Sequence, residues 1–334
     1  MPVSSSYHKI QQQILQYSKE GFEALALEVF RYQATANPLY ARFLKLLGKE
    51  PESIQSISAI PFLPISFFKS EIIKSGSWTE ERIFSSSGTT GATTSRHFLK
   101  QTDWYDQLSI QAFEYFYGSI ADYAILALLP AYLERQGSSL VHMADHFIKQ
   151  SRHSQSGFFL YNTQELLEVL DECRRSDVPV ILLGVSFALL DLAEQHPGLL
   201  GDKVILMETG GMKGRRKEII REQLHQQLQD AFQLEAIHSE YGMTELLSQA
   251  YSKGAGIFYC PPSMKVFTRE ITDPLSPEKP GKTGAINIID LANLDSCSFI
   301  ATDDLGKVYK DGSFEVLGRM DNSDIRGCNL LLIS

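Results

Sequence analysis

The chain has 334 residues, 43% of them hydrophobic, and a formal net charge of −9 at pH 7. This length permits one large domain or two ordinary ones, with enough apolar residues to fill a sizeable core. The acidic balance argues against a nucleic-acid surface, and the basic cluster Lys213-Gly-Arg-Arg-Lys217 is short. We therefore expect no nucleic-acid partner.

The sequence carries no targeting segment that we recognise. Its start, Met1-Pro-Val-Ser-Ser-Ser, lacks the charged and apolar regions of a signal peptide. The longest apolar run, residues 123–133, is too short to span a bilayer and contains Pro130. The 4 cysteines form no CxxC pair and no spacing typical of a metal site, so we expect reduced thiols. These features predict a cytoplasmic protein without a membrane span.

The first 60 residues favour helices. Apolar residues recur at helical spacing over residues 7–48, and Pro38 interrupts the pattern. The segment Ile60-Pro-Phe-Leu-Pro-Ile-Ser-Phe-Phe-Lys69 has two prolines and three phenylalanines, which is typical of an extended segment packed on a core. A helical N-terminal region over residues 1–59 is therefore predicted.

Short apolar runs then alternate with amphipathic stretches. This alternation is typical of parallel strands joined by crossover helices and predicts an α/β fold. After residue 256 the sequence becomes turn-rich, which indicates a β-rich subdomain over 256–334 attached to an α/β core over 60–255. The predicted strands are 123–129, 158–161, 179–184, 203–207 and 234–238, and the predicted helices are 140–149, 164–173, 187–194 and 215–232.

Two glycine-containing motifs follow consecutive predicted strands. Gly210-Gly211 and Tyr241-Gly242 should face one crevice, because ligands of open α/β sheets bind beyond the carboxyl ends of the strands. The alternative is that these glycines only form tight turns. The second motif belongs to His238-Ser-Glu-Tyr-Gly-Met-Thr-Glu245. The tyrosine ring offers a stacking face, its hydroxyl can reach a phosphate, and the Glu245 carboxylate can hold Mg²⁺.

Thr244 and Glu245 also suit the start of a helix, because a glutamate near a helix N-terminus interacts favourably with the helix dipole. Three histidines at helical spacing lack a carboxylate companion in the sequence, and we interpret them as structural: His142, His146 and His225. His238 differs from these three histidines only in lying beside the predicted nucleotide site.

A second candidate phosphate site lies upstream in Ser85-Ser-Ser-Gly-Thr-Thr-Gly91. It is not a Walker A motif, because no Gly-Lys-Ser/Thr follows. Free backbone N–H groups and hydroxyl donors can still surround a polyphosphate, although a plain flexible loop has the same composition. The residues predicted to contact phosphate are Ser86, Ser87, Gly88, Thr89, Thr90 and Gly91.

A third element is Ala301-Thr-Asp-Asp-Leu-Gly306, followed by Gly318-Arg-Met-Asp321. Asp304 can accept hydrogen bonds from both ribose hydroxyls, and Arg319 can contact the same sugar or a phosphate. The alternative interpretation is a hairpin with ordinary turn aspartates.

These pieces resemble motifs of the adenylate-forming superfamily, which includes acyl-CoA synthetases, firefly luciferase and peptide-synthetase adenylation domains. The loop ending at Gly91 resembles its phosphate loop, and Tyr241-Gly-Met-Thr-Glu245 its adenine and Mg²⁺ motif. Thr302-Asp-Asp-Leu-Gly306 resembles its ribose motif, and Gly318-Arg-Met-Asp321 its hinge. The resemblance covers residue 60 onward and implies the large N-terminal domain of that superfamily, with ATP and Mg²⁺ as cofactors.

Within the superfamily the chain is most similar to the acyl-protein synthetases of bacterial bioluminescence, and more distantly to phenylacetate–CoA ligases. The similar stretches are Ile60 to Lys69, Glu208 to Glu218 and Ile325-Arg-Gly-Cys-Asn329. This resemblance implies a fatty acid substrate, an acyl group held on Cys328, and a partner reductase or acyltransferase.

The sequence departs from the superfamily pattern in two ways. No lysine follows the phosphate loop, so Arg96 or Lys100 would have to supply a cation. The sequence also stops soon after the hinge motif, and we expect the mobile C-terminal domain to be absent. A thiolate is well suited to attack an acyl-adenylate, and in an extended strand Arg326 and Cys328 share a face, which would lower the thiol pKa. The alternative is an inert packing cysteine.

The sequence therefore predicts an enzyme that activates a carboxylic acid, with a fatty acid as the first choice, using MgATP, and transfers the acyl group to Cys328. One alternative is a ligase that delivers an acyl or aryl group to CoA or a carrier protein. The other is a non-catalytic homologue that serves as a scaffold.

Overall fold

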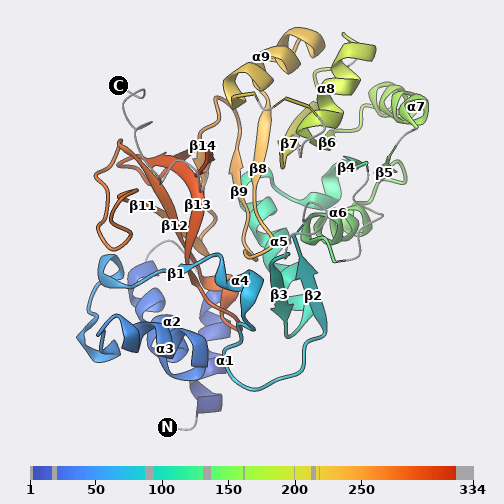
Figure 1. Cartoon of the computed structure of the whole chain (residues 1–334). Helices are drawn as coiled ribbons and strands as arrows, with labels where there is room; N and C mark the ends of the chain where they lie inside the picture. The colour runs from blue at the N-terminus through green and yellow to red at the C-terminus, as the bar shows by residue number, and fades with distance from the viewer. Residues whose placement is uncertain are drawn as a thin grey trace.

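The computed structural model describes residues 3–16, 21–86, 94–130, 137–160, 162–198, 200–211, 216–217 and 219–320. Across these ranges no helix has both the length and the apolar character needed to cross a bilayer. The chain folds as the predicted α/β structure (Figure 1).

The N-terminal region folds into helices over the stretch where the apolar spacing predicts them. Its helices are α1 (Val3–Leu15), α2 (Phe22–Ala36) and α3 (Pro38–Leu46). Pro38 is the first residue of α3, where its missing N–H costs nothing. Asn37 caps this helix, because its side-chain oxygen accepts a 3.0 Å hydrogen bond from the Tyr40 backbone N–H.

The middle of the chain forms a parallel sheet, in the order β5-β4-β6-β7-β8. Its strands are β4 (Ala124–Leu128), β5 (Gly157–Phe159), β6 (Val180–Val185), β7 (Val204–Thr209) and β8 (His238–Tyr241). The helices between them are α6 (Ser139–Gln150), α7 (Thr163–Arg175), α8 (Ser186–Gln195) and α9 (Arg221–Phe232). The predicted elements are confirmed in type and order.

Two boundaries differ from the predictions. The strand predicted at 234–238 is β8, which begins at His238, and the helix predicted from 215 begins at Arg221. β8 consists of His-Ser-Glu-Tyr, so a search for apolar runs misses it. It is stabilised by hydrogen bonding to β7 on one side and β9 (Ala250–Ser252) on the other.

After β8 the sheet becomes antiparallel and continues in the order β9-β10-β14-β13-β12-β11. The additional strands are β10 (Phe258–Tyr259), β11 (Met264–Arg269), β12 (Thr283–Asp290), β13 (Phe299–Val308) and β14 (Phe314–Arg319). With β1 (Leu63–Pro64), which pairs in parallel with β13, the described residues form one sheet of 12 strands. The hydrogen-bonded path crosses residue 255 without a break, and the domain limits at 59 and 255 stay a prediction.

A separate hairpin lies against this sheet and consists of β2 (Arg82–Ser85) and β3 (Arg96–Leu99). It is flanked by α4 (Phe67–Ser70) and by the longer α5 (Thr102–Tyr117). Figure 1 shows the hairpin between the N-terminal helices and the parallel half of the sheet. The short 3₁₀ turns are Pro51–Ser53, Ile57–Ala59, Ile120–Asp122 and Leu291–Asn293.

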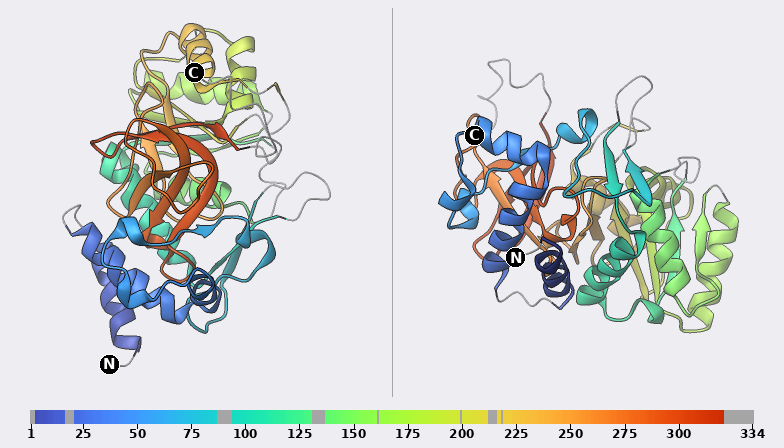
Figure 2. Two further views of the ribbon diagram at one scale, coloured as in Figure 1. Left: turned by 60° about the vertical axis from the view of Figure 1, so that its left-hand side comes forward. Right: turned by 90° about the horizontal axis from the view of Figure 1, so that it is seen from below.

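The N-terminal helices pack on the antiparallel half of the sheet. In Figure 2, as in Figure 1, α1 to α3 lie at the opposite end of the molecule from α7 to α9. Phe30 on α2 and Tyr40 on α3 contact the buried Phe299 ring of β13, with ring centroids 5.8 and 6.0 Å apart. Gln33 on α2 is fully buried and donates to the carbonyls of Asn293 and Leu294, at 2.8 and 3.0 Å.

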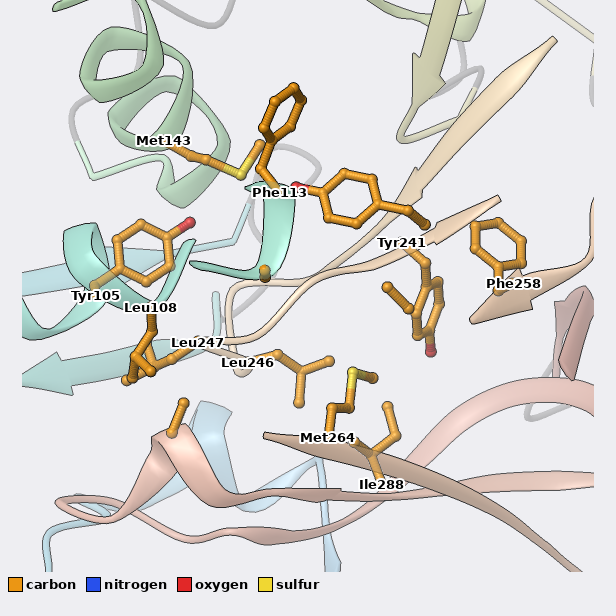
Figure 3. Close-up of a cluster of buried hydrophobic side chains, with 14 of the residues drawn as sticks. Tyr105, Leu108, Phe113, Met143, Tyr241, Leu246, Leu247, Phe258, Met264 and Ile288 are labelled. Atoms are coloured by element: carbon orange, nitrogen blue, oxygen red, sulfur yellow. The ribbon is translucent and has the colours of Figure 1, made fainter. Parts of the chain in front are cut away.

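The core continues from these helices to the parallel strands. β4 and β6 are buried along their whole length, which is why their sequences read as continuous apolar runs. Figure 3 shows how Tyr241, Leu246 and Leu247 enter the same buried cluster as Met264 and Ile288 of the antiparallel half. The segment that follows β8 is therefore part of the core.

Gln33→Leu should lower the free energy of unfolding by roughly 3 kcal/mol, because buried backbone groups lose their partners. The Gln33 side chain also accepts from the Ser298 N–H at 2.9 Å, so three backbone groups would be left unsatisfied. Urea denaturation followed by circular dichroism measures this change. The exposed Gln12→Leu is the matched control and should change stability by less than about 0.5 kcal/mol. Equal effects of the two variants would contradict the argument.

Candidate adenylate site

The base of the predicted phosphate loop is fixed by two serines. The Ser86 N–H donates to the Ser95 carbonyl at 3.1 Å, and the Ser95 N–H donates to the Ser86 hydroxyl oxygen at 2.9 Å. These bonds extend the β2–β3 hairpin by one residue on each strand. The remaining predicted loop residues lie outside the described residues: Ser87, Gly88, Thr89, Thr90 and Gly91.

The two glycine motifs lie at neighbouring strand ends, as their spacing predicts. Gly210 follows β7 with φ of 70°, a conformation that favours glycine, and Gly211 comes next. Tyr241 is the last residue of β8, and the exposed Gly242 follows it. β7 and β8 pair in parallel, so both motifs are at the carboxyl edge of the sheet.

The segment after Gly242 is a turn followed by an irregular stretch that leads to β9. The alternative prediction that Thr244 and Glu245 begin a helix is therefore wrong. Thr244 is half-buried, whereas Glu245 is 6% exposed. The Asn293 side-chain amide donates to the Glu245 carbonyl at 2.8 Å, which holds this turn against the loop at the end of β12.

The Glu245 carboxyl faces the loop base. Burial raises its pKa, and a hydrogen bond with Ser95 opposes this shift, together with the positive charges of Arg319 and Lys69. A buried carboxylate with a neighbouring hydroxyl and nearby cations is suited to binding a cation and phosphate together. The base of the predicted phosphate loop and the predicted Mg²⁺ ligand are therefore next to one another.

Tyr241 is joined to the antiparallel half of the sheet by its hydroxyl. This group donates to one Asp304 oxygen at 2.7 Å, and Arg319 Nε lies 3.2 Å from the other oxygen. Asp304 on β13 and Arg319 on β14 are paired across the two strands. In this structure the tyrosine hydroxyl, predicted to reach a phosphate, is bonded to the predicted ribose ligand instead.

β13, the strand that carries Asp304, is held by a buried arginine for which the sequence holds no motif. Arg269 on β11 is 7% exposed and donates to the carbonyls of Ile286 and Thr302, at 2.8 and 2.7 Å. The Thr302 hydroxyl oxygen in turn accepts from the Asp304 N–H at 3.1 Å. Burial lowers the pKa of Arg269, but its guanidinium is satisfied by fixed acceptors.

A second missed residue, Asp290, organises the irregular segment. One carboxylate oxygen accepts the N–H groups of Leu247 and Ser248, at 2.8 and 3.0 Å. The other accepts the Ser248 hydroxyl at 2.7 Å and the Ala292 N–H at 3.1 Å. Asp290 is fully buried, and burial raises its pKa. No local sequence signal relates it to the turn, because the two are more than 40 residues apart.

The contacts of the histidines interpreted as structural come from other elements of the fold. His142 lies 2.7 Å from an Asp106 oxygen, and His225 lies 3.5 Å from Glu208, so carboxylate companions exist on other elements. Such partners cannot be found by looking along one helix. His238 is at the start of β8, away from the strand end that carries Tyr241, and its ring nitrogen lies 3.1 Å from the Tyr117 hydroxyl.

The two candidate cations near the loop differ in position. Lys100 is 3.6 Å from Asp295 and 4.1 Å from the centre of the Tyr7 ring, so it is already engaged in the N-terminal region. Arg96 is exposed and lies opposite Ser85 in the hairpin, directly at the loop base. Of the two, Arg96 is the one beside the loop base.

A Mg²⁺ ion at Glu245 would need ligands from the nucleotide. Within the ranges that the structure describes, no group of three or more His, Cys, Asp and Glu side chains is arranged to hold a metal ion. Mg²⁺ is commonly held by one or two carboxylates together with substrate phosphates and water. The single buried carboxylate of Glu245 fits that donor set.

The comparisons with known proteins give structural matches. No family model and no curated protein matches the sequence. An open conformation of 2-hydroxyisobutyryl-CoA ligase, with 2-HIB-AMP and CoA, is 15% identical with a TM-score of 0.64, covering 89% of this chain and 73% of its own. The same ligase in the postadenylation state is 12% identical with a TM-score of 0.63, covering 96% and 69%.

ATP-bound MatB from Rhodopseudomonas palustris is 15% identical with a TM-score of 0.53, covering 71% of this chain and 47% of its own. The chain has the fold of the large domain of adenylate-forming ligases. It spans about half the length of MatB. At these identities the likeness establishes the fold, which confirms the predicted fold class. The activity, substrates and partners are taken up below as proposals.

The strand-end carboxyl of Glu240 provides a pH-dependent test of the described structure. It is buried and accepts a hydrogen bond from the Thr209 hydroxyl. Burial raises its pKa to about 7, and the negative Glu208 contributes to the rise. Because the folded-state pKa exceeds the ordinary value of 4.5, the unfolded chain releases this proton first as pH rises. Stability is therefore lost between about pH 4.5 and 7 and stays lower above that range.

Glu240→Gln should stabilise the protein at pH 8 by about 2–3 kcal/mol more than at pH 5, because it removes a charge that folding must bury. The amide oxygen can still accept from Thr209. Thermal or urea unfolding at the two pH values measures the difference, with the exposed Glu270→Gln as control. A Glu240 effect that is the same at both pH values would show that this carboxyl does not titrate as argued.

Proposed function

We propose that the chain activates a carboxylic acid by adenylation with ATP. The supporting observation is that three segments far apart in the sequence lie close together: the loop base at Ser86 and Ser95, the stretch from Tyr241 to the buried Glu245, and Asp304, to which Tyr241 is bonded. These are the residues proposed to contact phosphate, Mg²⁺ and ribose, and the chain that carries them has the fold of adenylate-forming ligases, which supports the proposal.

In the proposed reaction a substrate carboxylate oxygen attacks the α-phosphorus of ATP. A new P–O bond forms, and the bond to the departing pyrophosphate breaks, which leaves an acyl-adenylate. Mg²⁺ would offset the negative charge of the phosphates when bound. Glu245 and Thr244 would hold that ion and the phosphates, while Asp304 accepts hydrogen bonds from the ribose hydroxyls and Arg319 contacts the sugar or phosphate.

We further propose a fatty acid as substrate and Cys328 as acyl acceptor. The support is the sequence resemblance to acyl-protein synthetases, since Cys328 and Arg326 lie outside the described residues. The thiolate would attack the acyl carbonyl carbon, forming a C–S bond as the C–O bond to AMP breaks. A partner reductase or acyltransferase would then take the acyl group from the thioester.

A second candidate is transfer to CoA or a carrier protein. The observation in its favour is that structural neighbours, such as 2-hydroxyisobutyryl-CoA ligase, are named as CoA ligases. Both candidates begin with adenylation, whereas a scaffold homologue would show none. Acid-dependent exchange of labelled pyrophosphate into ATP separates an enzyme from a scaffold.

Glu245→Gln should reduce acid-dependent ATP–pyrophosphate exchange by at least about tenfold, because it removes a negative ligand for Mg²⁺ while keeping the side chain's shape. The matched control is Glu270→Gln, which changes an exposed glutamate on the same chain and should leave exchange unchanged. Full exchange in a folded Glu245 variant would remove this residue from the site.

Cys328→Ser should abolish a stable thioester while leaving adenylation close to normal, because an alcohol is a much poorer nucleophile than a thiolate. With MgATP and a panel of fatty acids, intact mass spectrometry should find one added acyl group that hydroxylamine removes. The control is Cys173→Ser, at a buried core cysteine, which should keep the label. If the Cys328 variant is labelled as fully as the wild type, or readily forms acyl-CoA, the second candidate is favoured.

A further inference from the structure

His97 on β3 is one of two described side chains, with Ser95, that join the hairpin to the turn at residues 244–245. Its ring is 1% exposed, and the edge of the Phe68 ring packs against it at 5.6 Å between centroids. Nδ1 lies 2.9 Å from the Thr244 carbonyl oxygen, and Nε2 lies 2.9 Å from the Ser296 hydroxyl oxygen. This lone histidine in a strand has no motif around it, so the sequence gives no signal for it.

The surroundings of the ring determine where its proton lies. The Thr244 carbonyl can only accept a hydrogen bond, so Nδ1 must carry the proton and donate it. Burial lowers the pKa of His97 to about 4, so the ring is neutral near pH 7 and Nε2 carries no proton. Nε2 therefore accepts from the Ser296 hydroxyl. This serine is held in place because its carbonyl accepts from Asn37 at 2.8 Å and from Ser75 at 2.6 Å.

His97 acts together with Ser95. The two residues are separated by two positions along the extended chain, so their side chains point to the same side. Ser95 bonds the Glu245 carboxyl, and His97 bonds the carbonyl of the preceding residue, Thr244. Ser95 and His97, neighbours on one side of the extended chain, thus hold the two consecutive residues Thr244 and Glu245.

We infer that His97 is a positioning residue, which fixes Thr244 and Glu245 relative to the β2–β3 hairpin through its Nδ1–H bond to the Thr244 carbonyl. This inference rests on the proposed adenylation function. Its chemical basis is that reacting groups displaced by about 1 Å can lose on the order of 100-fold in rate. The bond to Ser296, by contrast, anchors the ring to the scaffold and should matter for stability alone.

Two isosteric substitutions separate these contacts. The asparagine amide nitrogen is attached at the same distance along the side chain as Nδ1, so His97→Asn can still donate to Thr244. The glutamine amide reaches the position of Nε2, so His97→Gln can keep the contact with Ser296 but not the one with Thr244. Each variant loses one hydrogen bond and part of the ring, and we expect similar falls in melting temperature.

The acid-dependent ATP–pyrophosphate exchange should separate the two variants. His97→Asn should keep kcat within about threefold of the wild type, whereas His97→Gln should lose about tenfold or more in kcat with less change in KM for MgATP. Equal losses that follow the melting temperatures would overturn the inference and leave His97 a structural residue. If the wild type itself shows no exchange with any acid, the proposed function fails, and the inference that rests on it fails as well.

A direct measurement of the tautomer tests the bond itself. Long-range ¹H–¹⁵N correlation spectra of histidine-labelled protein distinguish a protonated Nδ1 from a protonated Nε2. The His97 signals are assigned as those that vanish in His97→Asn. An Nδ1–H tautomer near pH 7 supports the donated bond to Thr244. An Nε2–H tautomer would overturn the inference whether or not the enzyme is active.

Discussion

The structure depends on how one irregular segment, residues 242–249, satisfies its polar groups. Residues 245–249 are all buried, yet none of them belongs to a strand, so their N–H and C=O groups lack the partners that a strand ladder would supply. Asp290 accepts two of these N–H groups, Asn293 donates to the Glu245 carbonyl, and His97 contacts the Thr244 carbonyl. These partners come from the end of β12, the turn after it, and β3. The position of Glu245 is thus set by three elements outside its own segment.

The candidate site lies where the sheet changes from parallel to antiparallel. The parallel half supplies Tyr241 at the end of β8, and the antiparallel half supplies Asp304 and Arg319 on adjacent strands. The bond between Tyr241 and Asp304 connects the two halves at a point that is only 7% exposed on both residues. A ligand that bonds to Asp304 must therefore share this carboxylate with the tyrosine or displace it, so binding would loosen a contact between the halves.

The sequence was sufficient to predict those features of the fold that depend on a local pattern of residues. The apolar runs of β4 and β6 and the amphipathic helices follow from periodicity alone, and the predicted fold class is confirmed. The predicted position of β8 was displaced from the observed one, because the polar residues of this strand are buried by neighbouring strands and local hydrophobicity does not reveal this. Asp290 and His97 were missed for a related reason, since their roles arise only when segments far apart in the chain come together. The motifs at Tyr241 and Asp304 were recognisable, but their hydrogen bond was not.

The contact between α2 and the end of β12 has a consequence for the order of folding during synthesis. Gln33 and its partner Asn293 are 260 residues apart, and Tyr7 and Asp295 are 288 residues apart. At typical translation rates the ribosome needs on the order of 10 to 50 s to produce such a length of chain. Throughout that interval the buried face of α2 has no β13 to pack on, whereas the parallel strands can pair with recently made neighbours. Helices α1 and α2 are therefore synthesised well before the segments that bury them, and they reach their final surroundings late.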